Sequence, residues 1–193
     1  GELFVSRPNW KLFKSMRKEM ISVAFFGFLT VFSSLAVMNI DKYMINYYLG
    51  LGQAGIYSVS FYFATLILIP SRAIRKISGI FIADAWKEQN TQDIQLIYKK
   101  SSINMLLIGV FLFAGIWANI DNIFKILPKY ADGRYVILFI GLANIFDMGS
   151  GVSAGIIASS KNYRLHAYIM LFMIVSIVVN NIIFIPIYGL AGG

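Results

Sequence analysis

One acidic residue, Asp147, stands near the middle of the long apolar stretch 135–158. A charge at the centre of a bilayer helix costs about 2.5–3.5 kcal/mol on insertion scales, so such residues are candidates for binding a proton or cation in a water-filled pathway. The neighbours of Asp147 at four-residue spacing are small: Ala143, Gly151, Gly155 and Ser159. Small residues permit close helix packing, so the structural alternative is a protonated or hydrogen-bonded Asp147 at a helix contact.

Two short segments could bend the helices that carry these residues. The run DMGSG from Asp147 to Gly151 is rich in glycine, and broken helices of this kind lie near the substrate sites of transporters. Pro70 stands near one end of another apolar stretch, where a proline kinks or ends a helix. We expect Pro70, Gly151 and Gly155 to act as hinge or helix-packing residues.

Four further charged residues are candidates for a transport pathway or for ion coupling. Asp41 and Lys42 are adjacent at the end of the first apolar stretch, where opposite charges are often only interfacial. Arg72 and Arg75 follow Pro70 on one helical face and could bind a phosphate at the inner mouth of a pathway. Ordinary anchoring of the helix end at the membrane surface is the alternative for both arginines.

Several kinds of enzyme chemistry are excluded by residue types. His166 is the sole histidine and there is no cysteine, so no His-pair metal site, Ser-His arrangement or thiolate nucleophile can be assembled within this chain. No Walker loop or Rossmann glycine fingerprint occurs. We therefore expect no catalytic residue, no metal and no cofactor.

Polar residues at the predicted outer ends suggest packing and interfacial roles. Asn180 and Asn181 are expected to donate hydrogen bonds between helices rather than to bind substrate. The outer tyrosines fit an interfacial aromatic belt, with an aromatic surface for stacking sugars as the alternative; they are Tyr43, Tyr47, Tyr48 and Tyr130.

The elements that must position these residues are membrane helices. Of the 193 residues, 58% are apolar and only 13% are charged, about half the usual charged share. Five stretches are long enough to cross a hydrocarbon core, and their continuous apolar runs favour helices over barrel strands. The predicted fold is an all-α, polytopic integral membrane helical bundle with spans at 21–40, 55–74, 102–120, 135–158 and 165–185.

The basic residues predict both the partner surface and the orientation. The net charge is +8, and the basic residues lie between apolar runs rather than along one groove. This distribution favours lipid headgroups as the anionic partner and argues against nucleic acid. Only Lys42, Lys125, Lys129 and Arg134, of 17 Lys and Arg residues, fall on one side of the predicted membrane. The residue 1 side is therefore expected to be cytoplasmic.

Two cytoplasmic segments and the chain ends complete the prediction. Residues 1–20 form an amphipathic segment, with Trp10, Phe13, Met16 and Met20 on one helical face, suited to an anionic leaflet or to packing on missing protein. Residues 84–100 form a polar, surface-lying elbow between the two halves of a hairpin, in which Asn90 or Thr91 caps a helix. We expect residues 1–193 to be one membrane domain, a fragment of a longer chain.

Four stretches, taken together, resemble one transporter family over nearly the whole chain. They are DKYMINYYLGLGQAGIYSVS (Asp41–Ser60), AWKEQNTQDIQLIYKKS (Ala85–Ser101), IIASSKNYR (Ile156–Arg164) and NNIIFIPIYGLAG (Asn180–Gly192). The chain resembles the oligosaccharide flippases, or Wzx-type polysaccharide exporters, of the multidrug/oligosaccharidyl-lipid/polysaccharide superfamily.

The resemblance implies a two-bundle transporter, with this piece covering the start and most of the second bundle. Such proteins move polyprenyl-diphosphate-linked oligosaccharides, including O-antigen repeat units, across the bacterial inner membrane by alternating access, with a cation gradient as the proposed drive. It also implies the remainder of the chain, membrane lipids and a polysaccharide polymerase as partners. The chain departs from the family in having no Arg or Lys deep in a predicted span, so Arg72 and Arg75 or the missing bundle must supply the cationic lining.

Three alternatives remain open from the sequence. A cation-coupled drug or small-molecule exporter would share the architecture, and would differ in not requiring a lipid tail. The second alternative is a membrane-embedded polysaccharide-synthesis enzyme; the lone His166 and the lack of a paired acid-base site argue against it. A structural membrane subunit would tolerate the loss of the Asp147 charge.

Overall fold

The computed structural model describes residues 10–160 and 163–193, and within them it contains helices but no strand. The predicted all-α fold is confirmed for this part of the chain. In order, the elements are α1 (Trp10–Leu49), α2 (Leu51–Thr65), η1 (Leu66–Leu68), α3 (Ile69–Lys87), α4 (Thr91–Ala118), α5 (Ile120–Ile126), η2 (Pro128–Gly133), α6 (Arg134–Gly149), α7 (Ser153–Ser159), α8 (Tyr163–Tyr188) and η3 (Gly189–Gly192).

The described helices are compatible with a multi-pass membrane protein. By length and composition, four segments could cross a membrane: Met20–Leu49, Leu51–Lys87, Thr91–Ala118 and Arg164–Gly192. The segments Pro128–Gly149 and Ser153–Ser159 pass the same test together and are bent by 56°, so they would form a fifth, broken span.

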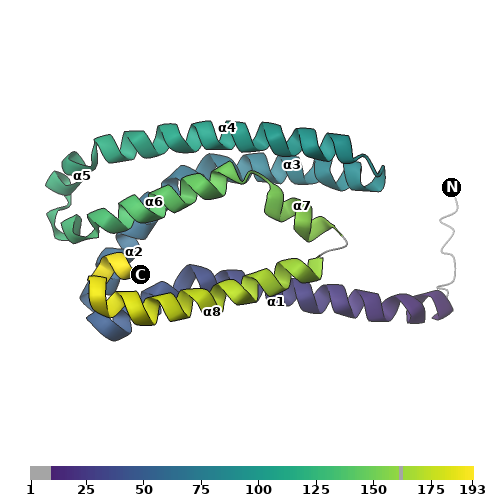
Figure 1. Ribbon diagram of the computed structural model, residues 1–193, viewed down its shortest axis with the longest axis horizontal. Coiled ribbons are helices and arrows are strands. Elements are labelled where there is room, and N and C mark those ends of the chain that lie inside the picture. Colours follow the sequence, from purple (N-terminus) through teal and green to yellow (C-terminus); the bar gives the residue numbers. More distant parts are fainter. Residues whose placement is uncertain (1–9, 161–162) are drawn as a thin grey trace, which may run out of the picture.

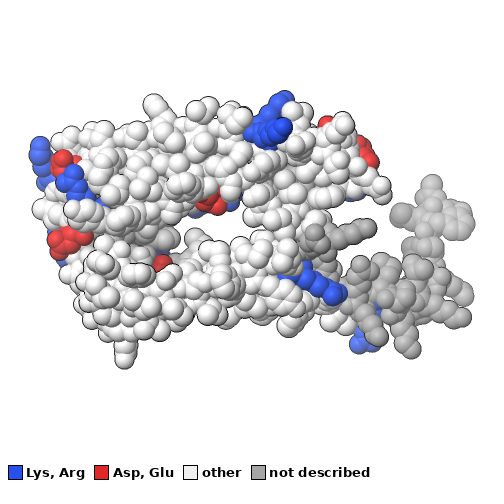
Figure 2. Space-filling model, in the orientation of Figure 1, with Lys and Arg blue, Asp and Glu red and all other residues white. Residues whose placement is uncertain are grey.

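The helices form two layers that meet at one end (Figure 1). One layer contains α3, α4 and α6, and the other contains α1 and α8. Helix α2 joins them, because it packs against both α1 and α6. The space-filling view shows a hollow between the two layers near the middle of the molecule (Figure 2). The bundle is therefore closed around α2 and more open along the rest of its length.

The main buried core lies at the closed end. Ile45, Tyr57, Val136 and Ile185 come from four different helices and pack in one cluster with little or no exposure. Away from this core, α1 and α8 leave large apolar side chains uncovered; the Phe28 side chain, for example, is 70% exposed. Exposed apolar surface of this extent is unfavourable in water but suits a lipid environment.

The first helix is longer and more continuous than predicted. It runs without interruption from Trp10 to Leu49, so Trp10–Met20 forms its first turns rather than a separate surface helix. The stretch 10–20 contains Lys, Met, Arg, Leu and Glu, which favour a helix, and no glycine or proline to end one. The predicted amphipathic residues 1–9 lie outside the described residues.

The predicted elbow 84–100 lies in a helical hairpin, and most of its residues belong to the two helices of that hairpin rather than to a separate surface helix. Helix α3 continues to Lys87, the chain turns, and α4 starts at Thr91. The Asn90 side chain accepts a hydrogen bond from the Asp93 backbone N–H at 3.2 Å, as expected of an N-cap. The predicted cap is confirmed at Asn90, and the polar residues after it form the first turns of α4.

Pro70 marks a local change of helix type. It has no N–H to donate to the Leu66 carbonyl, which would be its partner in a regular α-helix. Instead the Ile69 N–H bonds to the Leu66 carbonyl, and Leu66–Leu68 forms a 3-10 turn before α3 begins. Pro70 therefore neither ends the segment nor bends it sharply, because Leu51–Lys87 still forms one stretch of 37 residues.

Candidate functional site

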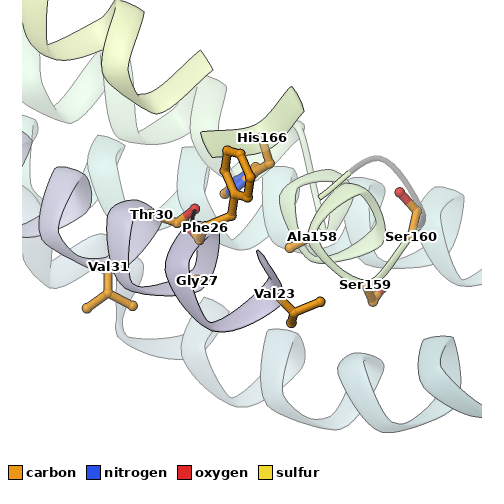
Figure 3. A pocket seen from close by; sticks show the side chains of 9 residues that line it. All are labelled: Val23, Phe26, Gly27, Thr30, Val31, Ala158, Ser159, Ser160 and His166. Carbon is orange, nitrogen blue, oxygen red and sulfur yellow. Dashed lines mark hydrogen bonds between the residues drawn. The ribbon is translucent and has the colours of Figure 1, made fainter. Parts of the chain in front are cut away.

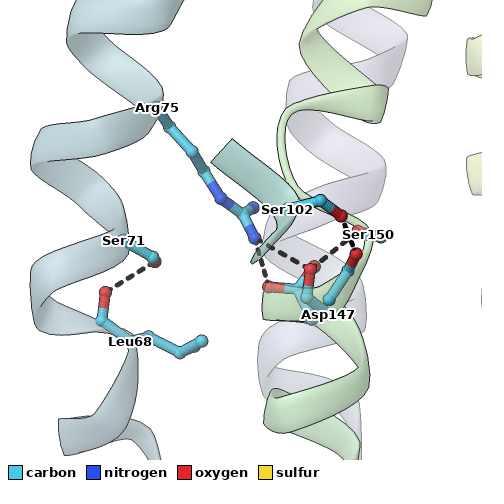
Figure 4. A network of polar contacts seen from close by, with 7 residues as sticks. Leu68, Ser71, Arg75, Ser102, Asp147 and Ser150 are labelled. Carbon is cyan, nitrogen blue, oxygen red and sulfur yellow. Dashed lines mark hydrogen bonds and ion pairs between the residues drawn. The ribbon is translucent and has the colours of Figure 1, made fainter. Parts of the chain in front are cut away.

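An ion pair joins α3 to α6 within the layer that contains α3, α4 and α6. Arg75 Nη2 on α3 lies 2.6 Å from Asp147 Oδ2 on α6 and also donates to the Asp147 carbonyl oxygen at 3.3 Å (Figure 4). The two side chains keep 36% and 47% of their surface exposed. The Arg75 Nε atom is buried and has no hydrogen-bond partner among the described residues. The guanidinium is thus held by one carboxylate but retains a donor for a further acceptor.

The end of α6 explains why polar groups gather at this point. The last carbonyls of a helix lack partners within it and must be satisfied by other donors. The Ser150 hydroxyl donates to the Asp147 carbonyl at 2.7 Å, and the Ser102 hydroxyl of α4 donates to the Gly149 carbonyl. Figure 4 shows these donors around Asp147. The helix break and the ion pair therefore form one local arrangement.

Gly151 is the residue that permits the break. Its φ is +64°, a conformation that residues with a side chain rarely adopt. A Cβ there would lie 3.0 Å from the Ser102 nitrogen and 3.1 Å from the Ser101 hydroxyl, so α4 approaches this turn closely. The predicted hinge at Gly151 therefore coincides with a turn that ends α6 at Gly149 and starts α7 at Ser153.

Among the described residues of the predicted small-residue face, Gly151 packs closely on a neighbouring helix, whereas Ala143, Gly155 and Ser159 do not. Because the chain bends by 56° between α6 and α7, residues at four-residue spacing no longer share one face. Ala143, Gly155 and Ser159 are exposed. A Cβ on Gly155 would meet nothing within 4 Å. Close packing on α6 instead involves Gly141, against Phe113 of α4.

The predicted depths of the two charged residues were inconsistent. The sequence placed Asp147 deep in a span and Arg75 at the inner mouth, yet their side chains are in contact. The segment α2–α3 spans 37 residues, or about 55 Å at 1.5 Å per residue, well beyond a hydrocarbon core of about 30 Å. Arg75 lies within this long segment, so it can share the depth of Asp147. Arg72 is exposed, and no hydrogen bond or ion pair involving it is found in the described part.

A second polar cluster surrounds Asp41 in the core of the closed end. The Tyr57 hydroxyl donates to Asp41 Oδ2 at 3.2 Å, and Asn181 Nδ2 donates to Asp41 Oδ1 at 2.8 Å. Tyr57 and Asn181 are 1% and 3% exposed. These bonds link α1 to α2 and α8, so the prediction of an interhelical hydrogen bond is confirmed for Asn181. No ion pair with Asp41 is found among the described residues.

Lys42 is separated from Asp41 despite being its neighbour in the chain. Its ammonium lies 4.8 Å from the ring centre of Phe61 and 5.0 Å from that of Tyr62, distances that permit cation–π attraction. Two of the predicted belt tyrosines, Tyr43 and Tyr47, are 75% and 83% exposed. Lys42 and Asp41 therefore belong to different surroundings.

Sequence reasoning missed Tyr57 and the pairing of Arg75 with Asp147. A signal for Tyr57 was present: α1 and α2 turn at Gly50, which has a φ of +86°, and Asp41 and Tyr57 stand at similar distances on either side of it. No comparable signal joins Arg75 to Asp147, because they are 72 positions apart on helices that are not consecutive.

Within the described residues, no group of three or more His, Asp or Glu side chains could hold a metal ion. In comparisons with known proteins, no protein-family model, curated protein or solved structure matches this chain.

Proposed function

We propose that the chain is part of a membrane flippase that moves polyprenyl-diphosphate-linked oligosaccharides to the outer leaflet by alternating access. The observation that carries the proposal is the Arg75–Asp147 pair, a guanidinium with an unpartnered Nε in an apolar helical bundle. Guanidinium groups bind phosphate oxygens through paired hydrogen bonds, and a diphosphate is the charged group of such a lipid. The resemblance of four sequence stretches to the oligosaccharide flippases supports the same reading.

The pair also suggests how the site changes as the lipid binds and leaves. The Asp147 carboxylate occupies part of the Arg75 guanidinium, so it competes with the diphosphate for the same hydrogen-bond donors. A cation gradient is the proposed drive of transport, as it is for the flippases that the chain resembles. The turn at Gly151 lies four residues from Asp147, where a change in pairing could move α7 relative to α6.

The setting of this activity is part of the proposal. The protein lies in the bacterial inner membrane with the residue 1 side cytoplasmic, and the chain packs with the first bundle of the transporter, which the rest of the protein supplies. The exposed apolar residues of α1 and α8 are available for lipid or for that bundle. A polysaccharide polymerase is the expected downstream partner.

The test is a transport assay on the intact protein in liposomes, with a known flippase in parallel. We expect movement of a polyprenyl-diphosphate sugar, and none of the same sugar diphosphate without its lipid tail. Failure to move the lipid-linked sugar while the known flippase does so would refute the proposal. Equal transport of tailless small molecules would favour the exporter alternative.

A further inference from the structure

A pocket of about 480 Å³ lies between α1, α7 and α8, away from the Arg75–Asp147 pair (Figure 3). Its volume falls within the range of about 300–1,000 Å³ that is usual for small-ligand sites. Most of its wall is apolar, and its polar lining comes from Thr30, Ser159, Ser160 and His166. The α1 wall includes Val23, Phe26 and Val31, which form an apolar surface about two helical turns long.

The polar end of the pocket has unused hydrogen-bonding capacity. His166 Nε2 is buried and has no hydrogen-bond partner among the described residues. The Thr30 hydroxyl donates to the Phe26 carbonyl, and the Ser159 hydroxyl donates to the Gly155 carbonyl, so both hydroxyl oxygens can still accept. An unpartnered buried nitrogen is unfavourable, and a ligand oxygen in the pocket would relieve it.

The surroundings of the pocket favour an anionic ligand. Arg164, two residues before His166, donates to the Ser22 hydroxyl at 3.1 Å and lies 5.6 Å from the ring centre of Phe26. Arg17 is exposed on α1, less than two turns before the pocket residue Val23. Both arginines lie on the side of the molecule that the charge distribution predicts to be cytoplasmic. That leaflet carries the anionic lipids, and basic pockets between membrane helices bind lipid headgroups there.

We propose that this pocket binds one anionic phospholipid of the inner leaflet. The phosphate accepts hydrogen bonds from His166 and Arg164, and one acyl chain lies along the apolar α1 wall. The lipid then bridges α1 to the start of α8, next to the end of α7. This proposal concerns a site separate from the ion pair and does not depend on flippase activity.

The test is native mass spectrometry of the intact protein with phosphatidylglycerol and, separately, with phosphatidylcholine of the same chains. We expect one retained phosphatidylglycerol, bound at least about fivefold more tightly than phosphatidylcholine. Gly27→Leu would place a side chain in the pocket, because Gly27 lines it and a Cβ there meets nothing within 4 Å. Gly115→Leu on α4 is the matched control, with equally open space and no place in the pocket.

Gly27→Leu and His166→Leu are each expected to weaken phosphatidylglycerol binding by roughly tenfold, while Gly115→Leu leaves it unchanged. The melting temperature without added lipid shows whether each variant is folded. Folded Gly27→Leu protein that binds phosphatidylglycerol as tightly as the parent would overturn the proposal, as would equal affinity for the two lipids. Displacement of phosphatidylglycerol by polyprenyl phosphate at a lower concentration than that of phosphatidylglycerol would also overturn it, because the pocket would then bind the transported lipid.

Discussion

Replacing Gly151 with alanine should destabilise the protein, because two effects act at that position. The φ of +64° costs a residue with a side chain about 1–3 kcal/mol. The new Cβ would also lie 3.0 Å from the Ser102 nitrogen, so α4 or the turn would have to move. At about 2–4 °C per kcal/mol for a chain of this size, the conformational cost alone should lower the melting temperature by roughly 2–12 °C.

Gly155→Ala is the matched control, four residues further along. Gly155 lies within α7, and a Cβ there meets nothing within 4 Å. Alanine in a helix is favoured over glycine by roughly 0.5–1 kcal/mol, so this variant should melt about 1–4 °C higher than the parent. The assay is thermal unfolding of the purified intact protein in detergent, followed by circular dichroism or by a thiol-independent dye. If both variants moved the melting temperature in the same direction by similar amounts, the left-handed conformation of Gly151 between α6 and α7 would be refuted.

Two other predictions concern polar contacts away from this turn. Asn181→Leu should destabilise the protein by about 1–3 kcal/mol, because it leaves the partly buried Asp41 carboxylate without one of its two donors. Asn180→Leu, at the exposed neighbouring position, should have little effect. Thermal unfolding compares the two variants, and equal losses would contradict the Asp41 cluster. Asn90→Ala should lower the free energy of unfolding by about 1 kcal/mol, because it removes the cap of α4. Gln89→Gly should raise it by about 1–2 kcal/mol, because Gln89 has a φ of +54°. Thermal unfolding measures both, and a stabilising Asn90→Ala would refute the capped hairpin.

The helices were predictable because their signals are local. Apolar runs indicated each membrane segment, and the Asn90 cap followed from residue type and position. The extent of α1 and α3 was not predicted, because the predicted spans ended at the charged residues that flank them. The second predicted span ended at residue 74, although charged residues such as Lys76 also favour a helix. Hydropathy shows where a helix can lie in lipid, but it does not show where the helix ends.

The contacts between distant residues could not be predicted in the same way. Asp41 was a candidate because of its charge, but its donor Asn181 stands 140 positions away on α8. Asp147 was expected to line a pathway or a packed helix face, and its partner in the structure is Arg75. This contact requires both the bend at Gly151 and a helix α3 that extends beyond the predicted span. Each of these pairings depends on how helices that are distant in the chain pack side by side, which no single stretch of sequence specifies.

The central claim is that the Arg75 guanidinium binds the diphosphate of the transported lipid under the control of Asp147. The most direct measurement is transport of a polyprenyl-diphosphate sugar per molecule of reconstituted protein for Arg75→Gln, Asp147→Asn and the control Arg72→Gln, whose parent residue is exposed and outside the ion pair. We predict that Arg75→Gln lowers transport at least about tenfold, as loss of a charge-assisted hydrogen bond of about 1.5–3 kcal/mol implies. Asp147→Asn should also lower transport, because no carboxylate then displaces the diphosphate from Arg75. Neither variant should lower abundance, and Arg72→Gln should keep the parental transport. Parental transport by Arg75→Gln or Asp147→Asn would contradict the claim and leave the ion pair a structural contact.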